Sequence, residues 1–161
     1  MKGFFRMLAV MLLTVTVLTG CTNRPKDKRV TCNDLSITLP GHYTNLSDQE
    51  FAADFDFIYG SPNEAVLGFK QDRSSLASPD ISAKDYAEMF IDTAELNSTI
   101  AEQDGLCIFT YTAIANDVEF TYLCGTFMSD TYFWVIQFYC PSQDYTDKQA
   151  DFLSYLKTVQ V

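Results

Sequence analysis

The sequence contains a single histidine, His42, in 161 residues. A Ser-His-Asp triad therefore has only one possible centre, and a zinc site of the usual histidine-rich kind is excluded. The chain also lacks a Gly-x-Ser-x-Gly elbow, a His-Glu-x-x-His helix and a glycine loop that would cradle phosphate. Since His42 follows Pro40-Gly41 at the end of a predicted strand, we interpret it as a turn residue rather than a base or a ligand.

Lysine and arginine are scarce and unevenly placed. Eleven are present against twenty-one acidic residues, and from Val30 onward only five stand against twenty, which gives that part a charge near −15. Nucleic-acid binding requires clustered Lys and Arg, so that function is excluded. Acidity of this kind also serves simply to keep an exported domain soluble. The few basic residues near the N-terminus would instead face anionic lipid headgroups.

No apolar run is long enough to span a bilayer. Residues 7–18 are apolar apart from two threonines, and Lys2 and Arg6 precede them. This length and this positive flank are typical of a signal peptide, and Asn23, Arg24 and Pro25 follow where a membrane-spanning helix would continue. The pattern predicts a removable signal peptide over residues 1–20.

The predicted cleavage region reads Leu18-Thr19-Gly20-Cys21. It resembles the lipobox of bacterial lipoproteins, and this resemblance implies that lipoprotein-processing enzymes attach a diacylglyceryl group to the Cys21 thiol and cut before Cys21. Two acyl chains, at about 0.8 kcal/mol per buried methylene, anchor a protein stably. We therefore expect a lipid-anchored protein on the extracytoplasmic face of a cell membrane.

Residues 21–31 are polar and charged and are predicted to be the lipidated tether, and residues 32–161 have the length of one domain. Ser82-Ala83-Lys84-Asp85 predicts a helix cap, and Asn116-Asp117 and Ser129-Asp130 predict tight connections between strands. Alternation predicts strands over 35–39, 55–59, 65–70, 99–102, 106–114, 118–128 and 131–140, a helical turn over 47–53, and helices over 82–96 and 146–158.

The last three strands should form an antiparallel meander that is apolar on both faces, so helices and loops should cover both sides in an α+β domain. The order of elements resembles the Mog1/PsbP-like fold. Two stretches support the resemblance: Ser36-Ile37-Thr38-Leu39-Pro40-Gly41-His42-Tyr43, and Phe55-Asp56-Phe57-Ile58-Tyr59-Gly60-Ser61-Pro62. The resemblance implies a non-enzymatic accessory role and brings no catalytic residues.

Four cysteines remain once Cys21 is lipidated. An even number in an exported domain favours disulfides. Cys107 and Cys124 lie on adjacent predicted strands, nearly opposite each other, so we predict a Cys107–Cys124 bond, which leaves Cys32 with Cys140. The alternative is four buried free thiols, which pack well in a core.

Two further groups of residues are candidates for binding sites. Asp48, Glu50, Asp54 and Asp56 offer oxygen ligands for calcium, but they lack the glycine turn and the bidentate position of an EF-hand loop. Alternation of Asp54 and Asp56 with Phe55 and Phe57 favours a solvated strand face. The thirteen Phe, nine Tyr and one Trp would suit sugar or peptide binding, although strand periodicity assigns most of them to the core.

These patterns predict a membrane-anchored accessory or binding module with no cofactor, no metal and no catalytic centre. Its partner would be an unidentified protein or envelope component. The alternative is a cell-envelope hydrolase that uses a pair of catalytic carboxylates. Twenty acidic residues follow Val30, and the sequence does not show whether two of them lie close enough in the fold to form such a pair.

Overall fold

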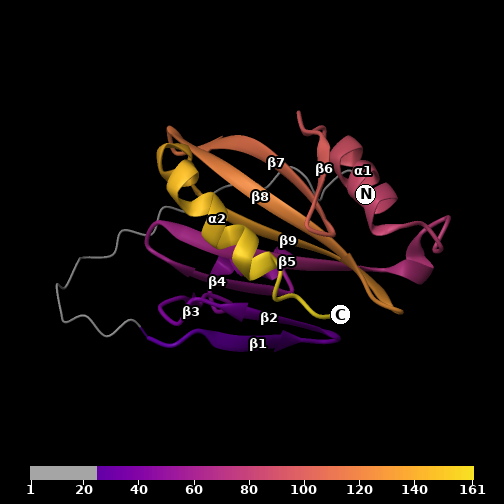
Figure 1. The fold of residues 1–161 in the computed structure, drawn as a ribbon, viewed down its shortest axis with the longest axis horizontal. Coiled ribbons are helices and arrows are strands. Elements are labelled where there is room, and N and C mark those ends of the chain that lie inside the picture. The colour runs from indigo at the N-terminus through magenta and orange to yellow at the C-terminus, as the bar shows by residue number, and fades with distance from the viewer. Residues whose placement is uncertain (1–24) are drawn as a thin grey trace.

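The computed structural model describes residues 25–161, without the side chains of Glu50 and Phe51. The predicted signal peptide and Cys21 lie outside the described residues. Within them, the chain forms a seven-stranded antiparallel sheet, a separate two-stranded hairpin and two α-helices (Figure 1). The strand order in the large sheet is β3-β4-β5-β9-β8-β7-β6.

The hairpin is formed by β1 (Lys28–Cys32) and β2 (Leu35–Leu39). The sheet contains β3 (Thr44–Asn45), β4 (Phe57–Ser61), β5 (Glu64–Asp72), β6 (Ile100–Gln103), β7 (Leu106–Ala115), β8 (Val118–Met128) and β9 (Tyr132–Pro141). The helices are α1 (Ala83–Thr93) and α2 (Tyr145–Leu156), with short 3-10 helices at Glu50–Asp54, Arg73–Ser75 and Ser142–Asp144.

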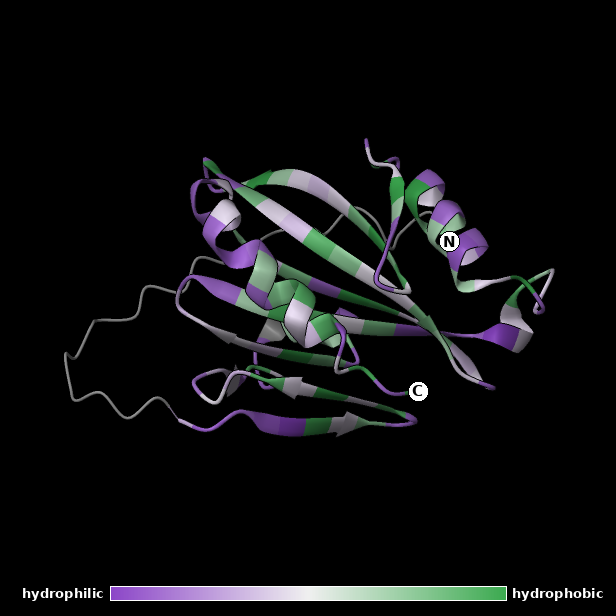
Figure 2. Ribbon diagram, viewed as in Figure 1, coloured by the Kyte–Doolittle hydropathy of each residue, from purple (hydrophilic) through white to green (hydrophobic). Residues whose placement is uncertain are grey.

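The sheet separates two apolar clusters. One face packs against α1, where Tyr86 stacks on Phe133 with ring centroids 4.5 Å apart. The other face packs against α2 and the β1–β2 hairpin, where Phe152 stacks on Phe138 at 5.1 Å. Figure 2 shows hydrophobic positions along the central strands, beneath α2. Among the described residues, the members of both clusters lie within 30–159.

The predicted meander is confirmed. β7 pairs with β8 and β8 with β9, both antiparallel, and the two predicted apolar faces correspond to the two clusters. Asn116 and Asp117 form the β7–β8 turn with φ of 49° and 63°, the positive values that a two-residue hairpin turn requires. Ser82 caps α1 in a capping box with Asp85, as its sequence predicts.

The folded domain begins earlier than the sequence pattern predicts. Lys28–Cys32 is strand β1, so the last part of the predicted tether (21–31) belongs to the hairpin. Only Val30 of this strand is buried, and the backbone pairing with β2 holds the rest. A strand with one inward apolar residue has no alternation that sequence reasoning could detect.

The region around residue 50 also differs from expectation. The predicted cap at Ser47 is not used, because the 3-10 helix begins after Gln49. Asp54 belongs to this short helix, so the interpretation of residues 54–57 as one alternating strand face is wrong for its first part. The two-residue strand β3 was not predicted.

Candidate functional site at the free edge of the sheet

β7 is longer than the strand that covers it. The outer strand β6 pairs with β7 only from Leu106 to Phe109, whereas β8 pairs with β7 from Cys107 to Ala115. Among the described residues, no strand pairs with the outer side of 110–115. In Figure 1, β6 lies beside α1, and β7 continues beyond it toward the β7–β8 turn. The sheet therefore ends in an unpaired strand edge at residues 110–115.

Two observations give the direction of the backbone groups along this edge. The Ser98 hydroxyl donates to the Thr110 carbonyl over 2.8 Å, and Ser98 precedes β6, so the Thr110 carbonyl faces outward. Ala115 and Val118 flank the two-residue turn and face each other across the hairpin. Since N–H and C=O of one residue point to the same side in an antiparallel strand, Thr112 and Ile114 present both groups outward.

A groove lies beside this edge, on the α2 side of the sheet, with a volume of about 450 Å³. Its base contains the buried side chains of Ile108 and Leu123. Its rim is polar and includes Ser98, Gln103 and Gln149, the last from α2. An apolar base with a polar rim is the usual construction of a binding groove.

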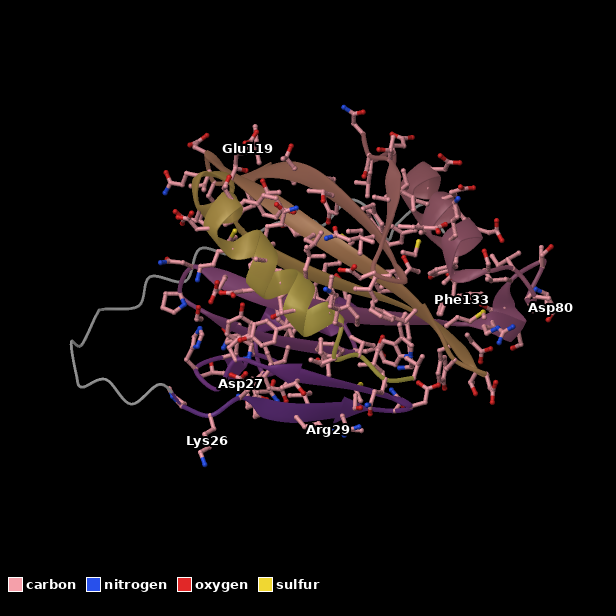
Figure 3. All side chains as sticks on the ribbon, in the orientation of Figure 1. Lys26, Asp27, Arg29, Asp80, Glu119 and Phe133 are labelled. Atoms are coloured by element: carbon pink, nitrogen blue, oxygen red, sulfur yellow. The ribbon has the colours of Figure 1, made fainter. Side chains whose placement is uncertain are left out.

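The segment between Lys84 and Lys148 carries acidic charged residues only. From Asp85 through Asp147 the sequence has eleven acidic residues and no Lys, Arg or His. Glu119 lies directly opposite Ile114 across the β7–β8 pair, so its carboxylate shares a face with the exposed end of the strand (Figure 3).

A second polar cluster surrounds the buried carboxylate of Glu64, at the start of β5. Lys148 Nζ of α2 lies 2.9 Å from Glu64 Oε2, and His42 Nε2 lies 3.1 Å from Glu64 Oε1. His42 is in a turn after β2, as predicted, and half of its side chain is exposed. Each Glu64 oxygen therefore has a basic partner, and the cluster ties three elements together.

The groups around Glu64 are poorly prepared for nucleophilic chemistry. Burial, with help from Asp144 and Glu64, raises the pKa of the Cys140 thiol to about 11, so the thiol is protonated at neutral pH. The hydrogen bond to Glu64 raises the pKa of Lys148, which keeps the amine protonated too. Burial, and then the nearby Glu64 carboxylate, raise the pKa of the Tyr43 phenol.

The predicted disulfides are not formed. Cys32, Cys107, Cys124 and Cys140 are all free thiols. Cys107 pairs with Thr126 and Cys124 with Phe109, so Cys107 and Cys124 are diagonal neighbours rather than opposite. Diagonal positions place Cβ atoms about 7 Å apart, beyond the roughly 4 Å of a disulfide. The prediction failed because its register was displaced by two residues.

Cys32 and Cys140 belong to different surroundings. The Cys32 thiol donates to the Asp56 carbonyl at 3.6 Å, near the β1–β2 turn. Cys140 lies near Glu64 and Lys148. Their predicted pairing is therefore not formed either.

The acidic stretch does not converge on a common point. Asp48 and Asp54 are exposed, while Asp56 forms an ion pair with Lys70. The Glu50 side chain is not described. Residues 25–161 contain no group of three or more side chains suited to holding a metal ion. None of the described helices has the length and apolar character needed to cross a membrane.

The sequence did not predict the unpaired β7 edge with its groove, and it did not predict the cluster around Glu64. The unpaired edge depends on how far β6 extends, which one strand pattern does not reveal. The long stretch without a basic residue was visible in the sequence and marks the charged surface. No sequence motif marked Glu64 as part of a polar cluster, because its partners His42 and Lys148 are distant in the chain.

The sequence matches no protein-family model and no curated protein. The fold is similar to that of cyanobacterial PsbP (CyanoP) from Synechocystis sp. PCC 6803, with a TM-score of 0.59, 11% identity, and coverage of 90% of this chain and 98% of that one. A structure from Bacteroides thetaiotaomicron VPI-5482 has a TM-score of 0.53 and 11% identity, with 86% of this chain and 49% of that one covered. At this identity the similarity is one of fold, and it confirms the predicted α+β, PsbP-like architecture.

Proposed function

We propose that this protein is a lipid-anchored, non-enzymatic binding module on the extracytoplasmic face of a cell membrane. The observation that carries the binding role is the groove of about 450 Å³ beside the unpaired edge of β7. The anchor rests on the sequence, where Leu18-Thr19-Gly20-Cys21 follows an apolar segment with a positive flank. A PsbP-like fold is compatible with an accessory role.

The start of the folded domain limits its distance from the proposed anchor. Pro25 and Lys26 lie next to Gly41, where an added Cβ would collide with their backbone oxygens. Three residues separate Cys21 from Pro25. The four Cα-to-Cα steps between them span at most about 3.6 Å each in an extended chain, so the reach is about 14 Å. Lys26 and Asp27 mark this end of the molecule in Figure 3. The lipidated domain would be held close to the bilayer, rather than standing well off it as its acidity alone suggests.

The Glu64 cluster supports a binding role more than catalysis. Both oxygens of the carboxylate are occupied by His42 and Lys148, so Glu64 is not available to accept a proton from a substrate. The neighbouring Cys140 thiol is protonated at neutral pH because burial raises its pKa to about 11. We assign this cluster a structural task.

Acyl labelling of the full chain in bacterial cells tests the anchor. The wild type and a Cys32→Ala control should incorporate an alkyne-tagged palmitate and partition into Triton X-114. Cys21→Ala should do neither, because the only proposed lipid attachment site is gone. Normal labelling of Cys21→Ala would contradict the proposed anchor.

Turnover assays test the non-enzymatic role. The purified chain from Thr22 should release no product from peptidoglycan, peptide, ester or glycan substrates above a heat-denatured control. Turnover that disappears in Glu64→Gln or in His42→Ala would place the protein in the hydrolase class instead.

A further inference from the structure

We propose that the edge of β7 at residues 112–115 binds an extended, basic peptide segment of a partner protein, which adds to the sheet as a further strand. This inference rests on the proposed binding role, and it does not depend on the lipid anchor.

The backbone of the edge is arranged for strand addition. Thr112 and Ile114 point their N–H and C=O groups outward, as the Ser98–Thr110 contact and the turn at Asn116 together require. An added strand would continue the line of β6, which already pairs with β7 as far as Phe109. In such complexes main-chain hydrogen bonds supply affinity, and alternate side chains supply specificity.

This edge lacks the devices that normally protect an exposed strand. Natural edges are shortened, bulged, or marked by Lys or Pro. The opposite edge of the sheet follows that rule, because β3 is two residues long. Residues 112–115 read Thr-Ala-Ile-Ala, their pairing with β8 has no bulge, and Ile114 is 73% exposed. The edge is therefore open to a partner strand.

The charge around the edge selects a basic partner. Glu119 shares a face with Ile114, and Asp117 lies in the adjacent turn. Neither carboxylate has an ion pair with a described Lys or Arg, whereas Glu102 and Asp104, at the β6 end, pair with Lys84 and Lys157. The negative charge beside residues 112–115 is thus uncompensated. A second copy of this chain carries the same excess of acid and would be repelled.

Peptide titration with the chain from Thr22 tests the proposal. The probe is fluorescein-labelled acetyl-Lys-Val-Lys-Thr-Lys-Val-Lys-amide, and the matched peptide has Glu at every Lys position. The basic peptide should bind saturably by fluorescence anisotropy, more weakly at about 0.5 M than at about 0.05 M salt, because screening reduces charge attraction. The acidic peptide should not bind.

Two variants with the same charge change locate the site. Ile114→Lys puts a positive charge on the exposed edge and should weaken binding about 10-fold or more, because like charges would then meet. Ala77→Lys adds the same charge at an exposed loop position away from β7 and should change binding by less than about 2-fold, as screened distant charges do. In the wild type, bound peptide should slow hydrogen exchange at the Thr112 and Ile114 amides measured by NMR.

Three results would overturn the proposal. They are equal weakening by the two variants, equal binding of the acidic peptide, and unchanged exchange at Thr112 and Ile114. A dimer that protects these same amides without peptide would also overturn it, by assigning the edge to a second copy. The mass of the peptide after incubation separately tests the proposed non-enzymatic function, because cleavage of the peptide would contradict it. The comparison of Ile114→Lys with Ala77→Lys would still show whether the peptide binds at the β7 edge.

Discussion

The indole N–H of Trp134 donates to Asp34 Oδ1 at 3.0 Å, and this bond joins the β1–β2 turn to the centre of the large sheet. Asp34 also accepts from the Ser129 hydroxyl at the β8–β9 turn. The bond makes the N-terminal hairpin part of the rigid domain.

Asp34→Ala should lower the free energy of unfolding by about 1–2 kcal/mol, because the indole N–H of the buried Trp134 loses its acceptor. Urea unfolding followed by the emission of Trp134, the only tryptophan, measures the change. Asp48→Ala, at an exposed carboxylate, should stay within about 0.5 kcal/mol of wild type. Equal effects of the two substitutions would show that the Asp34–Trp134 bond does not stabilise the hairpin.

Lys148→Met should destabilise the domain by about 1–3 kcal/mol, because the buried Glu64 carboxylate keeps only His42 as a partner. The matched control is Lys84→Met, which breaks the exposed pair with Glu102 and should cost less than about 0.5 kcal/mol. Adding Glu64→Gln to Lys148→Met should recover part of the loss in denaturant titrations. If the double variant is less stable than Lys148→Met alone, the unpaired charge is not the cause.

Stability should fall between pH 9 and about pH 11, in part because of Cys140. Burial raises the pKa of its thiol from 9.0 to about 11, so in this window the unfolded chain releases a proton that the folded domain keeps. The contribution of the protonated Cys140 thiol to the free energy of unfolding is therefore fully present below pH 9 and is lost as the pH rises toward 11. One proton changes the free energy of unfolding by about 1.4 kcal/mol per pH unit, and Cys140→Ala should remove about that slope. Ala150→Ser, on the exposed side of α2, should retain the wild-type slope.

Thiol titration of the chain from Thr22, unfolded in guanidinium without reductant, should find four free thiols. In the folded protein, the fully buried Cys124 should react more slowly than the partly exposed Cys32. The register places Cys107 and Cys124 on a diagonal, where a disulfide would require the strands to shift. Finding two thiols or none would contradict the free-thiol arrangement, and a Cys107–Cys124 bond in particular would require a different β7–β8 register.

Short sequence motifs correctly predicted a turn and a helix end that are formed by neighbouring residues. The Asn116-Asp117 turn set the β7–β8 hairpin, and Ser82 with Asp85 set the start of α1, because each acts within a few residues. The candidate site was not predictable in the same way. Its edge exists because β6 stops at four residues while β7 has ten, and its rim includes Gln149 from a distant helix.

The sequence alone determined an α+β domain with an acidic surface, a two-sided apolar meander and a predicted signal segment before Cys21, because periodicity, composition and short motifs encode these properties. Only the tertiary structure decided that Lys28–Cys32 is a strand, that Glu64 meets His42 and Lys148, and that Cys107 faces Thr126. Each of these depends on which strand lies beside which, and in what register. Pairing between distant segments is set by the packing of the whole core, which no short stretch of sequence specifies.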